Sequence, residues 1–457
     1  MNIYFPKIIR VGAGLSLIAA LLAFLVRSAE GQTPPVQRLS LGEAARLAAA
    51  QTAGVQSATA RVDEAQARVR QSRAALLPQI EATPNYTSHT LNSATFGFDF
   101  PAAPGQKPLL DPNGQIIGPV KLWDLRGQVT QSLYDPTARE RVKAARAGVT
   151  AASADVAIAA EQSATNAASI YVRALRNDAA LQARLADSTI AAELLGIARD
   201  QLAAGVGVGL DVTRAQSQLA AARAQLIAAR NDRGRVRLDL LRALNLPLDT
   251  RLELTDSLAS LPLPEVADEV AAVDVAVRSR PDIRAADAQL AAAQQQLAAI
   301  RATRLPTVGV FGNDGPIGTG LNHLLNTYTY GVQLTWPIFE GGRREGLTQE
   351  QEAVARDIDI RRRDLRQQVA VDVRSAFLDI ASAREQVDAA RERQRLAEME
   401  VQQARERFSA GVAGNADVVT ALSTLNSART GLIDALTAYQ AARVSLARAE
   451  GTVSQLR

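Results

Sequence analysis

The chain has 457 residues, of which 51 are Lys or Arg and 47 are Asp or Glu, giving a formal net charge of +4 at pH 7. This charge is too small for a chain of this length to indicate nucleic-acid binding, and no basic run favours it. The absence of Cys excludes disulfides, thiol catalysis and lipid attachment through an N-terminal Cys. With only two His a histidine metal cluster is excluded as well, and we expect neither metal nor cofactor.

Residues 1–31 have the pattern of a signal peptide. Two basic residues precede an apolar run over residues 11–26, which is shorter than a membrane helix needs. Small residues at Ala29 and Gly31 favour cleavage after Gly31, with an uncleaved anchor as the alternative. In either case the rest of the chain is predicted to leave the cytoplasm. No later segment has the run of about 18 apolar residues that a membrane-spanning helix requires.

The remaining chain divides into two halves built to one plan, residues 32–244 and residues 267–457, joined by a linker at 245–266 with a short β-like piece. In the first half we predict strands at about 78–88 and 121–134, a long helix 137–204, a turn 205–210 and a helix 211–244. In the second half we predict strands at about 306–312 and 327–337, a long helix 343–410, a turn 411–416 and a helix 417–450.

Local signals support the helices. Ser40 and Glu43 have the spacing of a capping box, and the helix that follows is expected to break near Gly54. No proline lies between Thr137 and Leu246. In the second long helix, small apolar residues recur at steps of three and four, which predicts close packing against neighbouring helices. They are Leu365, Val369, Val373, Ala376, Ile380, Ala383, Val387 and Ala390.

One stretch occurs twice, as AGVGVGLDVTRAQSQLAAAR at 204–223 and as AGVAGNADVVTALSTLNSAR at 410–429, an offset of 206 residues. Ten of the twenty aligned positions are identical, so the stretch is an internal repeat. Glycine follows the helix end in both copies, where left-handed backbone costs it nothing. An aspartate then lies at or near the start of the next helix, where it can cap backbone N–H groups. The glycine run lacks the βαβ context of a dinucleotide loop.

The two halves differ in length between the helices. Residues 54–78 align with 282–306 at an offset of 228, so the first half carries 228 − 206 = 22 extra residues before the repeated turn. The loop at 89–120, rich in Pro, Gly and Asn, is their expected place.

The fourth strand has the clearest alternation, and its apolar face is expected to contact lipid. A strand that spans a bilayer needs about 9–11 residues with apolar side chains outside and polar ones inside. The first and third strands fit less well, because Pro84 and Gly312 are expected to interrupt them. Four strands cannot close a barrel and lipid tolerates no open edge, so copies of the chain are expected to share one barrel. The predicted lipid-facing residues are Tyr328, Tyr330, Val332, Leu334 and Trp336.

The signal peptide, the duplicated plan and the turn G-x-x-x-x-x-D-V together resemble the TolC-like outer membrane factors, or outer membrane efflux proteins, over about residues 38–450. P-I-F-E-G-G at 337–342 and L-Y-D-P at 133–136 resemble that family's strand-to-helix junctions. The resemblance implies a mainly α protein with a small β part. Three copies would form a twelve-stranded outer-membrane β-barrel continued by a periplasmic α-barrel of long antiparallel coiled-coil helices.

The resemblance also implies a function. The trimer would be the outer-membrane exit duct of a tripartite efflux or type I secretion system, a passive channel driven by an inner-membrane pump through a periplasmic membrane-fusion (adaptor) protein. The alternative is a soluble periplasmic coiled-coil scaffold or adaptor whose hairpins pack in water. An enzyme is not expected, because no nucleophile–base set or metal cluster can be named.

Two groups of functional residues follow from the resemblance. The periplasmic aperture, the narrow inner end of the duct, would be lined by Asp211, Asp417, Thr420 and Phe408. The adaptor would dock on the two turns, at Gly205, Val206, Gly207, Val208, Gly209, Leu210, Gly411, Val412, Ala413 and Gly414. The better-known members carry Tyr and Arg around the second turn, where this chain has Phe408 and Ala413, and Thr420 replaces a second carboxylate. These departures argue against a closing network of the same kind.

Overall fold

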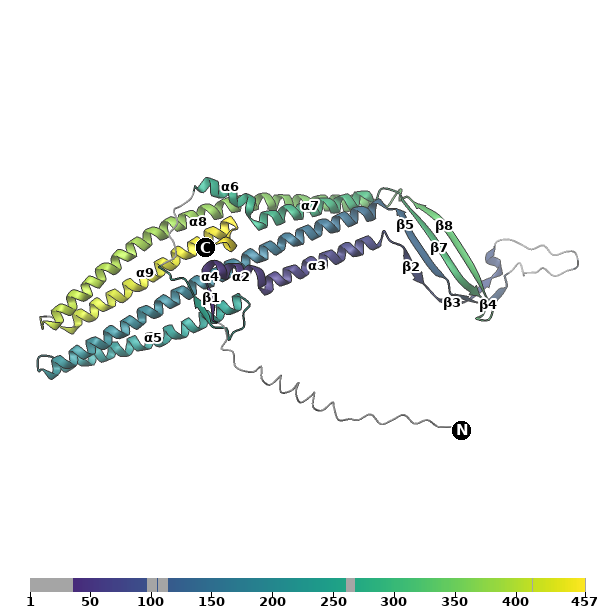
Figure 1. The fold of residues 1–457 in the computed structure, drawn as a ribbon. Helices are drawn as coiled ribbons and strands as arrows, with labels where there is room; N and C mark the ends of the chain where they lie inside the picture. Colours follow the sequence, from purple (N-terminus) through teal and green to yellow (C-terminus); the bar gives the residue numbers. More distant parts are fainter. Residues whose placement is uncertain (1–35, 97–104, 106–113, 260–267, 413, 457) are drawn as a thin grey trace, which may run out of the picture.

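The computed structural model describes residues 36–96, 105, 114–259, 268–412 and 414–456. The predicted signal peptide and part of the linker, 260–267, lie outside these residues. The molecule is elongated, with helical hairpins forming one end and a twisted sheet the other (Figure 1). The grouping of long helices with a small sheet part agrees with the predicted fold class.

The first helices show how local sequence sets element ends. β1 (Gln37–Leu39) leads into α2 (Leu41–Gln51) and α3 (Ala53–Ala74). The predicted capping box is confirmed, since the Glu43 N–H donates to Ser40 Oγ at 3.3 Å and the Ser40 N–H donates to the Glu43 carboxylate at 2.8 Å. The helix breaks at Thr52, two residues before Gly54, because Thr52 adopts extended backbone.

Two pairs of helices form the repeated hairpins. The first pair is α4 (Pro136–Ala203) and α5 (Gly209–Ala243), and the second is α8 (Arg343–Ser409) and α9 (Asn415–Glu450). α4 has 68 residues and therefore extends about 100 Å. α5 and α9 begin two residues earlier than predicted, so both turns are shorter than expected.

The remaining helices, α6 (Glu269–Ser279) and α7 (Pro281–Ala302), lead into the second half of the sheet. α4 packs against α3 and α7 nearer the sheet and against α5 nearer the turns (Figure 1). At the middle of the molecule, β1 pairs in parallel with β6 (Leu252–Leu254), a pairing between distant residues that no local pattern indicated. The short 3₁₀ helices η1 (Ser93–Phe96) and η2 (Val453–Gln455) complete the described elements.

Many side chains of the helical core are small, as the predicted stripe requires. Of the eight stripe residues in α8, six are buried: Val369, Val373, Ala376, Ile380, Ala383 and Val387. The other two, Leu365 and Ala390, are partly buried and pack against the same clusters. The stripe is therefore confirmed, and Ala at these positions allows helices to approach closely.

The sheet contains β2 (Gln79–Ala82), β3 (Asn85–Asn92), β4 (Ile116–Asp124), β5 (Gly127–Tyr134), β7 (Thr307–Gly318) and β8 (Leu324–Thr335). The paired residue numbers sum to 209 both in β2–β5, where Gln79 pairs with Thr130, and in β3–β4 from Asn85 with Asp124 to His89 with Val120. β2 and β3 are thus one strand line interrupted at residues 83–84, and β4 and β5 one line interrupted at 125–126. The sheet has four such lines, as predicted.

The strands are longer than predicted. β3 continues to Asn92 and β4 begins at Ile116, so both ends of the expected 89–120 loop are strand. Its middle, 97–104 and 106–113, lies outside the described residues. The expected interruption of the third strand is wrong, because β7 runs unbroken through Gly312 and pairs with β5 and β8 on its two edges.

Candidate channel wall and periplasmic turns

The register sorts the sheet into two chemically different faces, because residues directly opposed in antiparallel strands point to the same side. One face carries mainly apolar side chains: Ile80, Val129, Val308, Val310, Tyr328, Tyr330, Val332 and Leu334. The other carries mainly polar ones: Gln79, Glu81, Gln128, Thr130, Ser132, Thr307, Asn313, Thr329, Gln333 and Thr335. Gln131, Asp314 and Asn326 are exceptions on the apolar face. The Gln131 amide donates to the Leu76 carbonyl at 2.9 Å, and the Asn326 amide donates to the Asp314 carboxylate at 2.9 Å.

The apolar face is exposed in the single chain. The exposed fraction is 80 % for Tyr330 and 71 % for Val332, although both lie within β8. Four of the five predicted lipid-facing residues lie on this face of β8, whereas Trp336 lies just beyond its end and is also exposed. Tyr328 and Tyr330 stack at 6.0 Å between ring centroids. Aromatic rings of this kind are typical of the edges of a membrane-spanning apolar band.

The polar face also carries a few large apolar side chains: Ile317 and Leu325 lie on it towards the strand ends, and Phe311 lies further in, for a steric reason. Phe311 lies directly opposite Gly331, and a Cβ on Gly331 would come within 2.8 Å of the Phe311 ring. The ring therefore lies over the glycine of the neighbouring strand. This arrangement covers the backbone that glycine leaves open in a strand.

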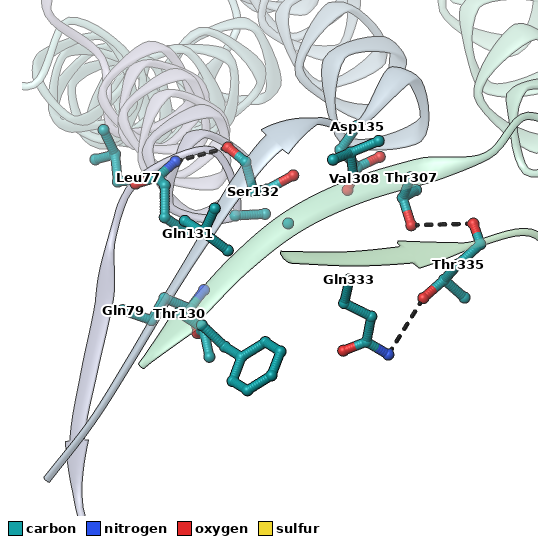
Figure 2. Close-up of a pocket in the computed structure, with 14 residues that line it drawn as sticks. Leu77, Gln79, Thr130, Gln131, Ser132, Asp135, Thr307, Val308, Gln333 and Thr335 are labelled. Carbon is teal, nitrogen blue, oxygen red and sulfur yellow. Dashed lines mark hydrogen bonds between the residues drawn. The ribbon is translucent and has the colours of Figure 1, made fainter. Parts of the chain in front are cut away.

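A hollow of about 300 Å³ lies where the strands meet the helices. Figure 2 shows hydroxyl and amide side chains around it, among them Gln79, Thr130, Ser132, Gln333 and Thr335. Gln131 donates to the Ser132 carbonyl at 2.7 Å, and the carboxylate of Asp135 accepts the Ala138 N–H at 2.8 Å as the N-cap of α4. These groups can hydrogen-bond water, and they do not form a nucleophile–base arrangement.

The two repeated turns leave the preceding helix in the same way. Gly205 and Gly411 have φ of +73° and +69°, the left-handed region predicted for them. In each turn the next N–H closes the helix end: Val206 donates to the Gln201 carbonyl and Val412 to the Arg407 carbonyl, both at 3.0 Å. Val206 and Val412 are 79 % and 73 % exposed, so both turns present a valine to solvent.

The turns also contact each other. The Asn415 side chain donates to the Asp211 carbonyl at 3.1 Å, and the Gln201 side chain donates to the Phe408 carbonyl at 3.1 Å. Asn415 is completely buried by this contact. The two hairpin ends of one chain therefore form a single surface. Of the residues predicted there, Ala413 lies outside the described residues.

Asp211 and Asp417 lie near the helix starts as expected, but neither of them caps its helix. The helices begin earlier, with Val208 and Gly414 as the N-cap residues, and neither helix has a side-chain cap. Both aspartates lie in the first helical turn, where a negative charge still favours the helix dipole. Asp211 lies 3.9 Å from Arg214, and Asp417 is exposed. Their carboxylates are thus not engaged in capping.

Phe408 does not line an opening in this structure. Its side chain is 3 % exposed and packs in a cluster with Leu194, Val401, Val418 and Leu422, because the phase of α8 turns it between the helices. The assignment of Phe408 to the aperture is therefore wrong. Thr420 is exposed, and its hydroxyl donates to the Ala416 carbonyl of its own helix at 2.9 Å.

Ion pairs between α4 and α9 were missed by the sequence reasoning. The buried carboxylate of Asp187 accepts from Arg184 and Arg429, each at 3.1 Å, and Arg176 pairs with Asp434 at 2.8 Å. The identity of Arg429 with Arg223 in the repeat was a signal for Arg429, but not for its partner. The pairs of Arg429 with Asp187 and of Arg176 with Asp434 join the two hairpins of one chain, whereas Arg184 pairs with Asp187 within α4.

Two further observations concern the described residues alone. None of their helices combines the length and apolar character needed to cross a membrane. No three of their His, Asp or Glu side chains gather in a way that could hold a metal ion.

Comparisons with known proteins give the class of this fold. It is similar to the outer-membrane channel OprN, with 20 % identity, a TM-score of 0.70 and 91 % of each chain covered. It is similar to the outer membrane protein VceC of Vibrio cholerae, with 19 % identity, a TM-score of 0.69 and coverage of 90 % and 96 %. It is also similar to the MtrE outer membrane channel of Neisseria gonorrhoeae, with 18 % identity, a TM-score of 0.70 and coverage of 90 % of this chain and 88 % of that one. No curated protein sequence matches the chain.

The family follows from the sequence itself. The pattern of the outer membrane efflux proteins matches residues 44–246 and 272–452, which is most of the chain and both of its halves. The chain therefore belongs to the outer membrane efflux protein family, and it is an outer-membrane transport channel protein rather than an enzyme.

Proposed function

We propose that three copies of the chain form one continuous duct through the outer membrane and the periplasm. The two-faced sheet is the observation that carries this proposal. Among the described residues, β2 pairs only with β5 and β8 only with β7, so each chain has two free strand edges. Free edges are not tolerated in lipid, and pairing β8 of one copy with β2 of the next satisfies both.

The proposed number of copies follows from the width that the lumen of the barrel needs. Two copies would supply eight strands, and a barrel of about eight strands is filled by its own side chains. Three copies supply twelve strands and leave room for water and cargo. The polar face then lines the lumen, and the apolar face with Val332 and Tyr330 contacts lipid.

The helical hairpins continue the duct on the periplasmic side. They are too polar to lie in the bilayer, and about 100 Å of helix is long enough to extend far across the periplasm. The described residues form a wall, and we infer that cargo moves along it passively while an inner-membrane pump drives export through a periplasmic adaptor. Either a tripartite efflux or a type I secretion system has this architecture.

The joined turns are the proposed docking surface for the adaptor. They present exposed apolar side chains, including Val206, Val208, Leu210 and Val412, at the end of the molecule farthest from the sheet. Glycines at Gly205 and Gly411 leave open space around the backbone, which allows a partner helix to approach closely. Exposed apolar side chains clustered in this way are typical of protein contacts.

A soluble periplasmic scaffold, the alternative, is disfavoured by the sheet. It would leave the apolar face, with Ile80 and Tyr330 at 77 % and 80 % exposure, in water. Fractionation of cells tests the choice. We expect the full chain in the outer membrane, extracted only by detergent, with the mass of three chains in crosslinking or light scattering. A monomer released without detergent would contradict the duct.

The aspartates near the turns are proposed to form a ring at the periplasmic aperture. Neither Asp211 nor Asp417 caps its helix, although Asp211 has Arg214 at 3.9 Å, and three copies bring six carboxylates together. Acidic rings attract cations and make pores cation-selective. We expect the Asp211→Asn, Asp417→Asn double variant to lose most of the cation selectivity in planar-bilayer recordings and most of the block by multivalent cations added from the periplasmic side.

The control for this experiment is Asp239→Asn, an exposed aspartate of α5 far from the turn, which should leave selectivity and block unchanged. Asparagine has nearly the same shape as aspartate, so the comparison isolates the charge. Selectivity and block that survive in the folded double variant would remove the ring.

A further inference from the structure

The repeat allows a position-by-position comparison of the two hairpins. One ion cluster is present in the first hairpin and absent from the second. In the first hairpin, Asp178 of α4 accepts from Arg233 at 2.6 Å and from Arg237 at 3.3 Å, both on α5. One carboxylate therefore ties α4 to α5 through two guanidinium groups. Its side chain is 30 % exposed, so the cluster lies at the edge of the helix contact.

The second hairpin keeps one of the two cations, lacks the carboxylate and has a further cation in its place. At the offset of 206 residues, Asp178 corresponds to Arg384 of α8, Arg233 to Tyr439 of α9, and Arg237 to Arg443 of α9. A positive charge thus stands where the first hairpin has its negative one. Within the described part of the chain, no carboxylate lies in ion-pair distance of Arg384 or Arg443.

Buried donors at the same place lack partners. Tyr439 is completely buried and Gln440 is 1 % exposed, yet the Tyr439 hydroxyl and the Gln440 Nε2 have no hydrogen-bond partner among the described residues. The Gln440 carbonyl is used, because it accepts from Arg443 Nη1 at 2.8 Å. A buried donor without an acceptor is costly. The two cations are more open, since Arg384 is exposed and Arg443 half-buried.

The electrostatics agree with this geometry. Burial raises the pKa of the Tyr439 hydroxyl, while the positive charges of Arg443 and Arg384 act to lower it. Burial also lowers the pKa of the Arg443 guanidinium, as expected of a cation that no negative group compensates. The two guanidinium groups and the unpartnered donors of Tyr439 and Gln440 therefore all suit a negative ligand.

We propose that Arg384, Arg443, Tyr439 and Gln440 bind a small oxyanion of carboxylate or phosphate type between α8 and α9. The anion takes the place that the Asp178 carboxylate occupies in the first hairpin. Guanidinium groups and a hydroxyl donate to such oxygens readily, and charged hydrogen bonds of this kind are strong. The site belongs to one chain's own hairpin, so it is independent of the proposed duct.

Hydrogen–deuterium exchange on the purified full-length protein in detergent tests the site, with inorganic phosphate as the probe at constant ionic strength. A ligand that binds only the closed hairpin slows its opening by the factor 1 + [L]/Kd, so at ten times its Kd phosphate should slow exchange in α9 around Tyr439 about tenfold. The equivalent peptide of α5, around Arg233, is the control within the same molecule. It should not respond, because Asp178 already fills its site.

Two variants complete the test. Arg384→Asp should restore the built-in carboxylate of the first hairpin, which slows exchange without phosphate and abolishes the response to it. Tyr439→Phe keeps the ring and removes one donor, so it should weaken the response severalfold. Equal slowing of both hairpins by phosphate, or a full phosphate response in Arg384→Asp, would overturn the proposal.

Discussion

Val332→Arg is expected to remove most of the assembled trimer from the outer membrane. Val332 lies opposite Val310 on the apolar face, three residues before the end of β8. An arginine facing lipid at mid-bilayer costs about 2–4 kcal/mol, and the ring of three copies incurs this cost three times. The measurement is the yield of detergent-extracted trimer, compared with that of the unsubstituted chain.

Gln333→Arg is the matched control, one residue further along the same strand. Gln333 lies opposite Gly309 on the polar face and borders the hollow shown in Figure 2, so an arginine there can reach water. We expect nearly normal trimer. An equal loss from both substitutions would contradict the assignment of the two faces, since a shift of one residue exchanges them.

Gly411→Val is expected to abolish export while leaving trimer in the membrane. Gly411 has φ of +69°, and left-handed backbone costs a residue with a side chain about 1–2 kcal/mol, more for a branched one. Nothing lies within 4 Å of the added Cβ, so the fold itself has room for it. The substitution should therefore change the shape of the docking surface and not the fold. The measurement is the export of cargo per assembled trimer.

Gly431→Val provides the comparison, because Gly431 lies within α9, away from the turn, and an added Cβ there also meets nothing within 4 Å. It should export normally. The double variant Gly205→Val, Gly411→Val changes both turns of the proposed surface. Normal export by that variant would show that the adaptor docks elsewhere.

Some features of the candidate site depend on how each helix is rotated about its axis and on contacts between distant residues. Neither could be predicted from the sequence. Phe408 was assigned to the aperture because it lies at a matching family position. Whether its side chain is buried depends on how α8 is rotated toward α4 and α9. The capping assignment of Asp211 failed because Gly209 and Leu210 already adopt helical backbone, and a helix end depends on a balance of small energies. Asp178 could be named as a charge, but not as the partner of Arg233.

Features set by neighbours along the chain could be predicted from the sequence alone. The capping box at Ser40, the left-handed glycines of the turns, the stripe of α8 and the alternation of β8 are local, because each depends on residues a few positions apart. The duplicated plan and the four strand lines followed from them. Only the tertiary structure decided the parallel pairing of β1 with β6, the register that joins β2 to β3 across residues 83–84, and the carboxylate that one hairpin has and the other lacks. These contacts join residues tens to hundreds of positions apart. Their energies depend on how the chain folds in space, so no local sequence pattern indicates them.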